Sequence, residues 1–358
     1  MRRTLKLIAS VFLASILNGC VQKEVLDDIT LIEGIGFDYI DSKNILGTIV
    51  IPVYLPKQAP KNITFSAKAE IKKSMLQDIQ RQTADPLVTG SLAVVLFSKT
   101  LTEKVGILPL VDPFQRDPGV GSGLYLAVVD GETKELLGGN YGIRGNATYI
   151  SNLMNHNIKN EDLPQTNLQW FLADFYQEGK TPFIPQIKQI GKDKLKITGI
   201  SLLKYGKMVD FIEAEDMFFF KLLVDKYSEG LHRVKIESGE AAVRSIRSSH
   251  NFELTKRNPM EITIHIKVDG IINEFTGQEL TPKNIQELKQ QFSKDIQKES
   301  LKLVQRFIGK QIDPIGIGHY VKTQTRNFDF NNWRENQYKD IVVKIKPDVK
   351  ISESGVIE

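Results

Sequence analysis

The sequence predicts an α+β fold of more than one domain, in which mostly antiparallel or mixed sheets pack against helices. Apolar runs at 92–97 and 124–129 are bounded by turn residues, which is typical of buried strands. Residues 260–268 alternate apolar with polar side chains, as a half-buried strand does. Residues 282–308 carry a long apolar stripe at helical spacing. At 358 residues the chain is long enough for two or three domains.

Residues 1–19 have the layout of an export signal peptide. Arg2, Arg3 and Lys6 form a positive start, and an apolar run of about eleven residues follows over 7–17. This run is too short to cross a membrane comfortably, because a spanning helix needs about 20 apolar residues. No later segment is apolar enough either, so we expect no transmembrane span in the mature chain.

Cys20 is the predicted site of lipid attachment. Residues 17–20, Leu-Asn-Gly-Cys, resemble the lipobox of bacterial lipoproteins, in which diacylglycerol is attached to the cysteine sulfur. The thiol is required because sulfur forms a stable thioether, and the small Gly19 lets the signal peptidase close on the bond. Two acyl chains hold a protein firmly, since each buried CH₂ group contributes about 0.8 kcal/mol. We therefore expect a signal peptide at 1–19 and a lipidated tether at 20–28.

A first mixed α/β domain is expected over 29–190. Its last helix is predicted at 167–179, with four apolar side chains on one stripe and Gly179 as the stop. Pro52 cannot donate to a sheet ladder, so the strand that contains it is expected at an edge. The remaining expected elements are strands at 29–39, 45–54, 92–97 and 124–129 and a helix at 69–83.

A second α/β domain is expected over 191–358, and it opens with a hairpin. Two strand-like runs, 195–203 and 207–212, flank a turn at Gly206. The apolar run 217–224 follows three acidic residues, which favour the start of a helix because they complement its dipole.

The clearest helix of the sequence spans 282–308 in this second domain. Thr281 is a good capping residue, Pro282 suits the first helical position, and Gly309 ends the pattern. A last alternating strand is expected at 341–351.

The charge balance and the cysteine count limit the possible functions. The chain has 47 Lys and Arg residues against 43 Asp and Glu, a formal net charge of +4, and loss of the signal peptide reduces this charge to about +1. Nucleic-acid-binding domains present a strongly basic face, so we expect no nucleic acid partner. Cys20 is the only cysteine, so no intrachain disulfide can form and the fold depends on its core.

No motif in the sequence assembles a catalytic group. The five histidines are scattered, and none stands beside a second His or Cys at metal-ligand spacing. Gly179-Lys180-Thr181 imitates the end of a phosphate-binding P-loop, but Asp174 replaces its first glycine. The glycines of 119–123 fit neither a dinucleotide fingerprint nor a nucleophile elbow. We therefore expect no enzyme activity, no metal and no cofactor.

Aromatic side chains in two predicted helices are expected to pack in the core. Phe171 and Phe175 lie on the apolar stripe of the first helix, and Phe218 and Phe219 lie in the second. Trp170 lies off the stripe, so it is the better candidate for an exposed contact.

Four short motifs follow the lipobox in a fixed order. They are Glu-Gly-Ile-Gly-Phe-Asp at 33–38, Arg-Asp-Pro at 116–118, the segment 197–207, and Asp-Pro-Ile-Gly-Ile-Gly at 313–318 with Asn-Trp-Arg at 332–334. Together they span nearly the whole mature chain. In this order they resemble the GerAC-type family, the C-subunit lipoproteins of spore germinant receptors.

The resemblance implies a non-enzymatic subunit on the outer face of the spore inner membrane. It implies membrane-spanning A and B subunits as partners, in a receptor that responds to small nutrient germinants. Asp38, Arg116 and Asp117 either fix loops through ion pairs and caps or contact a partner, and we favour the first role. Trp333 is expected to be a packed aromatic.

A solute-binding lipoprotein of a transporter is the alternative hypothesis. It would share the anchor at Cys20, but it should show two similar α/β lobes around a ligand cleft. A surface hydrolase is a third class, and it would need paired carboxylates or a Ser/His pair in one cleft.

Overall fold

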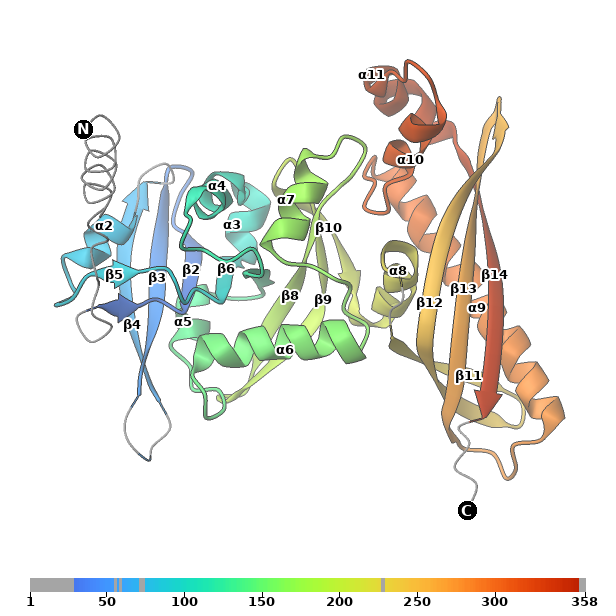
Figure 1. Ribbon diagram of the computed structural model, residues 1–358, viewed down its shortest axis with the longest axis horizontal. Helices are drawn as coiled ribbons and strands as arrows, with labels where there is room; N and C mark the ends of the chain where they lie inside the picture. The colour runs from blue at the N-terminus through green and yellow to red at the C-terminus, as the bar shows by residue number, and fades with distance from the viewer. Residues whose placement is uncertain (1–28, 55–56, 58–59, 71–74, 227–228, 354–358) are drawn as a thin grey trace, which may run out of the picture.

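Figure 1 shows two sheets of unequal size, with helix α8 (Met217–Val224) between them. This computed structural model describes residues 29–353, apart from 55–56, 58–59, 71–74 and 227–228. The predicted signal peptide, Cys20 and the tether lie outside the described residues. The predicted α+β fold with mixed sheets is confirmed.

The larger sheet has eight strands, here in chain order: β2 (Gly34–Tyr39), β3 (Asn44–Val53), β4 (Lys61–Glu70), β6 (Val94–Ser98), β7 (Tyr125–Val129), β8 (Phe183–Ile190), β9 (Lys194–Lys204) and β10 (Lys207–Glu213). Their order in the sheet is β10-β9-β8-β7-β6-β2-β3-β4. The four central strands β8, β7, β6 and β2 run parallel. Antiparallel partners extend the sheet at both ends, so its two edges are built from hairpin-connected strands.

Helices cover both faces of this sheet. One face packs against α2 (Met75–Gln80), α3 (Lys99–Lys104), α4 (Leu108–Arg116) and α7 (Leu168–Tyr176), and the other against α5 (Thr133–Leu137) and α6 (Asn146–Asn160). A short parallel pair, β1 (Thr30–Leu31) with β5 (Leu87–Val88), lies beside it. The residues of β2 alternate between the two faces. The side chains of Ile35 and Phe37 lie in the core of the first face, and Gly34 and Gly36 face the helices on the second, where they leave room for Ala147 and Thr133.

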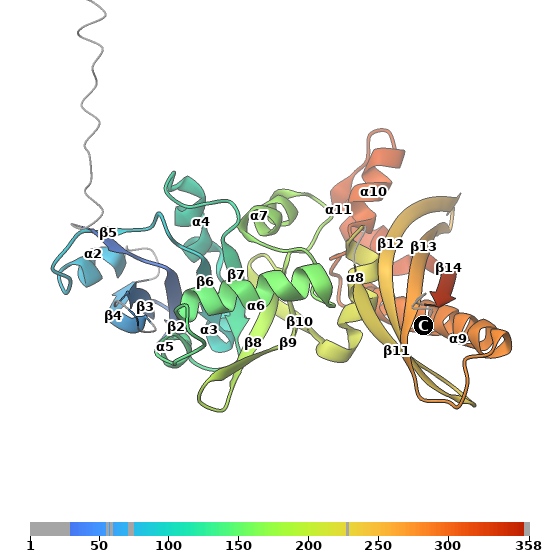
Figure 2. The same ribbon diagram turned by 60° about the horizontal axis from the view of Figure 1, so that its bottom comes forward.

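The smaller sheet has the order β11 (Gly230–Ile236), β12 (Gly239–Arg257), β13 (Met260–Phe275), β14 (Val342–Glu353). Strands β13 and β14 are parallel, and the connection between them contains the long helix α9 (Pro282–Gly309). Figure 2 shows α9 lying along one face of this sheet. The predicted cap is confirmed, because the Thr281 hydroxyl accepts a hydrogen bond from the Asn284 N–H at 3.2 Å.

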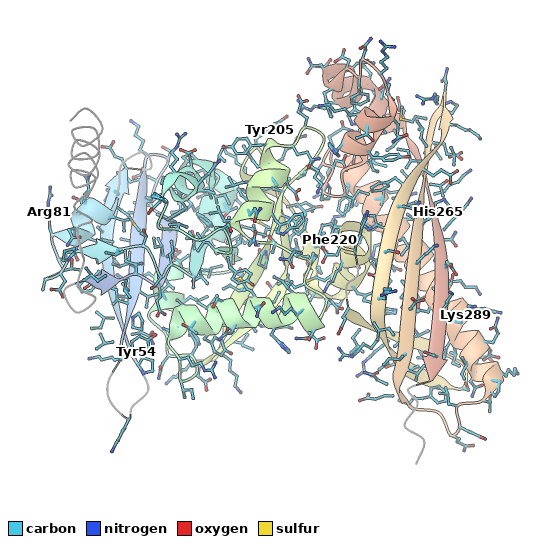
Figure 3. The ribbon with its side chains drawn as sticks, in the orientation of Figure 1. Tyr54, Arg81, Tyr205, Phe220, His265 and Lys289 are labelled. Carbon is cyan, nitrogen blue, oxygen red and sulfur yellow. The ribbon has the colours of Figure 1, made fainter. Side chains whose placement is uncertain are left out.

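Helix α8 joins the two sheets through one continuous apolar core. Seven of its eight residues are buried, so the helix is apolar on nearly every side. The Phe220 ring lies 5.1 Å from Phe183 of β8 and 5.9 Å from Phe307 of α9, both at steep angles (Figure 3). Phe218 packs against Phe292 of α9 at 5.9 Å.

A buried lysine adds a polar connection to the same helix. Lys221 is 2% exposed, and its ammonium group donates to the carbonyl of Ile158, at 2.9 Å, and to that of Glu161. These carbonyls belong to the last turn and the end of α6, where a helix lacks its own donors. Burial lowers the pKa of Lys221. Helix α8 is therefore bound to both units by packing and to α6 by hydrogen bonds.

The structure corrects two local predictions. Strand β3 is internal, with β2 and β4 on its two sides; Pro52 is tolerated because the pairing with β2 ends at Val50. The predicted helix over 69–83 is helical only at Met75–Gln80 among its described residues, because 61–70 forms strand β4, which the pattern did not indicate.

The boundary expected near residue 190 does not coincide with the end of a sheet. The larger sheet continues through β9 and β10 to residue 213. The division into 29–190 and 191–358 stays a prediction. The hairpin at Gly206 and the helix at 217–224 form as expected, with Lys204 paired to Lys207 across the turn.

We expect Phe220→Ala to lower the free energy of unfolding by about 3–5 kcal/mol, because it leaves a cavity where the two sheets meet. Ile143→Ala is the control, since this side chain is 77% exposed and its loss should change stability by about 0.5 kcal/mol or less. Urea unfolding of the full chain, followed by circular dichroism, measures both. Equal losses in the two variants would contradict the role of Phe220.

Candidate functional site

A loop and a turn from distant parts of the chain meet beside α8. The loop 177–182, called here the junction loop, follows α7, and the turn 313–318, called here the capping turn, leads into α10 (Ile317–Gln324). The Thr181 N–H donates to the Asp313 carbonyl at 2.9 Å, and the Asp313 N–H donates to the Thr181 hydroxyl at 2.9 Å. This reciprocal pair connects residues 132 positions apart.

Asp313 organises the capping turn. Its buried carboxylate accepts hydrogen bonds from the N–H groups of Gly316 at 2.8 Å, Ile317 at 3.0 Å and Gly318 at 2.6 Å. It thereby satisfies donors that the first turn of α10 leaves free. Burial raises the pKa of Asp313 to about 6, and the three donors oppose that shift. Gly316 has a φ of 81°, a conformation that favours glycine.

The P-loop-like residues Gly179-Lys180-Thr181 lie in the junction loop, and each has a structural role there. Gly179 has a φ of 79°, and a Cβ atom there would lie 2.6 Å from the backbone nitrogen of His319, at the start of α10. The Lys180 ammonium donates to the Asp174 carboxylate at 2.7 Å. Thr181 pairs with Asp313, so Gly179 and Thr181 hold the loop against the start of α10, and Lys180 ties it to α7.

Asp38 of the larger sheet caps the start of a helix, as Asp313 does in the capping turn. Its buried carboxylate accepts from the Thr133 N–H at 2.6 Å, the Thr133 hydroxyl at 2.9 Å and the Lys134 N–H at 2.9 Å, which caps α5. A Cβ atom on Gly36 would collide with the Thr133 hydroxyl. The first family-like motif therefore positions α5 on the sheet.

Asp117 and Arg116 also have local partners. Asp117 accepts from the Thr89 hydroxyl at 2.7 Å and from the Gly119 N–H at 2.8 Å. Arg116 pairs with Asp112 one turn earlier on α4, at 2.9 Å. The favoured role, fixing loops and helix ends, agrees with the contacts of Asp38 and Asp117, whereas the Arg116 ion pair lies within α4 and fixes no loop.

A cleft of about 600 Å³ opens between the two units beside the junction loop. It is bordered by α6, α7, β8, the end of α8, and β12. Its polar and aromatic lining includes Trp170, Asp174, Lys180, Asp225, Glu229 and His250. Trp170 is 49% exposed, as expected for a contact residue. We call this space the junction cleft.

Buried and half-buried ionisable groups line the inner wall of the junction cleft. Asp225 accepts a hydrogen bond from the Gln165 N–H at 2.9 Å, and burial raises its pKa to about 6. Burial also raises the pKa of Asp174, although Lys180 opposes the shift. His250 lies with Nδ1 3.1 Å from the Asp225 carbonyl oxygen, and burial lowers its pKa to about 4.

A smaller cavity of about 260 Å³ lies on the other side of Lys180. Trp333 and Tyr338 line it, and Trp333 is only 2% exposed, which confirms the expected packed aromatic. The Tyr338 hydroxyl donates to the Ile312 carbonyl at 2.6 Å, next to the capping turn. This cavity thus lies next to the contacts that hold α10.

Sequence reasoning did not single out Asp225 or His250. They are 25 residues apart, and only the docking of β12 against the end of α8 brings them together. Within the described ranges, no group of three His, Cys, Asp or Glu residues is arranged to hold a metal ion. No helix in that part of the chain is long and apolar enough to cross a membrane.

The units on the two sides of the junction cleft are not similar lobes. One is an eight-stranded mixed sheet covered on both faces, and the other is a four-stranded sheet with one long helix. The two similar lobes expected of a solute-binding lipoprotein are therefore not found in the described residues.

We expect Gly179→Ala to destabilise the chain by about 2–4 kcal/mol, because it adds a backbone collision to the cost of a left-handed alanine. Gly191→Ala is the matched control: its φ is 71°, but a Cβ there meets nothing within 4 Å. The control should lose only about 1–2 kcal/mol. Thermal unfolding of both variants measures the difference, and equal losses would rule out the collision.

Comparisons with known proteins cover almost the whole chain. Residues 22–189 match the family described as spore germination protein N-terminal domain. Residues 198–355 match the family described as spore germination B3/GerAC like, C-terminal. The gap between the two matches falls at 190–197, inside the β8–β9 hairpin of the larger sheet.

Individual relatives agree with these matches. The spore germination protein GerQC of Bacillus cereus is 32% identical over 365 residues, which cover 100% of this chain and 99% of the relative. The spore germination protein A3 of Bacillus subtilis is 21% identical over 69% of this chain and 70% of its own length. The crystal structure of the GerBC protein superposes with a TM-score of 0.60 at 15% identity, over 89% of this chain and 96% of that chain, so the two share a fold. The chain therefore belongs to the GerAC-type family of spore germination proteins, the C subunits of germinant receptors.

Proposed function

We propose that this chain is a lipid-anchored, non-enzymatic subunit of a spore nutrient germinant receptor. The observation that carries the proposal is the full-length similarity to GerQC, behind a sequence that has the layout of a lipoprotein signal ending at Cys20. In this proposal, lipid on Cys20 holds the chain on the outer face of the spore inner membrane. Its partners are the membrane-spanning A and B subunits.

The anchor has a clear physical purpose in such a receptor. A chain confined to the membrane plane meets its partners at a high effective concentration, so modest protein contacts suffice for assembly. The structural evidence is compatible with a contact role, because the family-like motifs serve to fix helices and loops in place. A protein that binds partners through rigid surfaces needs contacts that fix its helices and loops in this way.

We expect Cys20→Ala to move the protein from the membrane to the soluble fraction of spore extracts. The rate of nutrient-triggered germination should fall by roughly tenfold or more, since the effective concentration given by the anchor is lost. Ser15→Ala is the matched control, because it changes the apolar run but leaves the lipidated residue. Membrane fractionation and the optical-density drop of spores are the measurements.

A spore strain that lacks this chain tests the receptor role separately. It should respond poorly to at least one nutrient, and restoring the chain should restore that response. An unaltered response to all nutrients would contradict the proposal. Co-isolation with multi-span subunits encoded next to its gene would support the A and B partners.

A further inference from the structure

The inner wall of the junction cleft carries Asp225, an acidic group that forms no ion pair among the described residues, although the charges of Lys221 and Lys180 act on its pKa. Lys180 pairs with Asp174 at 2.7 Å, and Lys221 is held by the end of α6. Within the described part of the chain, no cation forms an ion pair with Asp225, and lysines act on it only from longer range. The Asp225 carboxylate is held in place by the Gln165 N–H, which fixes it against the cleft.

The other charges around Asp225 are placed differently. Lys159 and Lys226 also line the cleft, but both are exposed, so their ammonium groups can stay in water. Glu229 adds a second half-buried acid. An anionic ligand would therefore meet the half-buried carboxylates of Asp225 and Glu229, whereas a cationic ligand would find a counter-ion in Asp225.

An aromatic side chain stands at the border of the same cleft. Trp170 projects from α7 with half of its surface exposed, and its backbone is fixed by the Asn167 cap at 2.9 Å. An indole face attracts organic cations, and aromatic rings with carboxylates are a recurrent way to bind ammonium groups. Phe183 and Val224 supply apolar surface next to these groups.

We propose that the junction cleft binds a small organic molecule through its ammonium group, with Asp225 as the counter-ion and Trp170 as the aromatic wall. A volume of about 600 Å³ suits a small molecule rather than a folded partner. That this molecule is a nutrient signal rests on the proposed function. The binding itself does not, and it can be measured on the protein alone.

The site should lose its ligand as the pH falls. Asp225 has a pKa of about 6, so its carboxylate is mostly charged at about pH 8 and mostly neutral at about pH 5. His250, which faces it from β12, has a pKa of about 4 and stays uncharged over most of that range. Asp174 and Lys180 from α7 and the junction loop, Lys221 and Lys226 near the end of α8, and Glu229 before β11 also face Asp225.

Three probes with the same branched tail separate the possible contacts. Leucine carries both charges, 3-methylbutylammonium lacks the carboxylate, and 4-methylpentanoate lacks the ammonium group. The full chain in detergent should bind the first two in the millimolar range and not the third, as measured by ligand-observed NMR. Binding of the two ammonium probes should weaken at about pH 5, where Asp225 is neutral.

Matched variants locate the binding. Asp225→Asn should weaken binding of 3-methylbutylammonium roughly tenfold or more, because a charge-assisted hydrogen bond is lost. Asp162→Asn is the control: Asp162 is also a half-buried carboxylate that accepts one backbone N–H, from Leu231 at 3.0 Å, but it is not among the residues that line the cleft. Trp170→Leu should weaken binding severalfold, and Tyr176→Leu, an exposed aromatic on the same helix, should not.

The results distinguish this proposal from the receptor role. Failure of both ammonium probes to bind, binding of 4-methylpentanoate alone, or equal effects of Asp225→Asn and Asp162→Asn would each overturn the site. None of these would affect the germination defect expected of spores that lack the chain. Conversely, normal germination without the chain would overturn the receptor role and leave the measured binding intact.

Discussion

The burial of α8 is the constraint on which the arrangement of the two sheets depends. Phe220 contacts the larger sheet on one side and α9 on the other, so neither unit can shift without opening a cavity at its ring. Lys221 then connects the helix to the end of α6. The packing of α8 between the two sheets and the hydrogen bonds of its Lys221 to the end of α6 together hold the elements that border the junction cleft.

Buried carboxylates at helix starts solve a second problem, that of placing short helices on a sheet. Asp38 holds α5 and Asp313 holds α10, and each accepts three hydrogen bonds from the chain it caps. In both places a glycine removes the side chain that would keep the helix away. A short helix has little apolar surface of its own, so such contacts determine its position.

Much of this architecture could be predicted from the sequence, and the failures have physical causes. The helix that begins at Pro282 and the hairpin at Gly206 depend on local signals, namely caps, turn residues and periodicity. Strand β4 has mixed polarity because it lies at an edge, so no clear pattern marks it. The candidate site depends on contacts across long stretches of chain, such as Thr181 with Asp313, and no local pattern encodes those.

The position of β14 at the end of the described chain has a consequence for biogenesis. This strand pairs with β13 along its whole length, and the two are separated by the long helix α9. The smaller sheet therefore cannot be completed until residues 342–353 are available, about 80 residues after the β13 residues with which they pair, and pairing over such a separation is slow. Loss of residues 342–353 would leave the β13 edge that they cover without a partner strand. Such an exposed edge can pair with strands of other chains. Such a truncation is therefore expected to cause aggregation and not only a loss of stability.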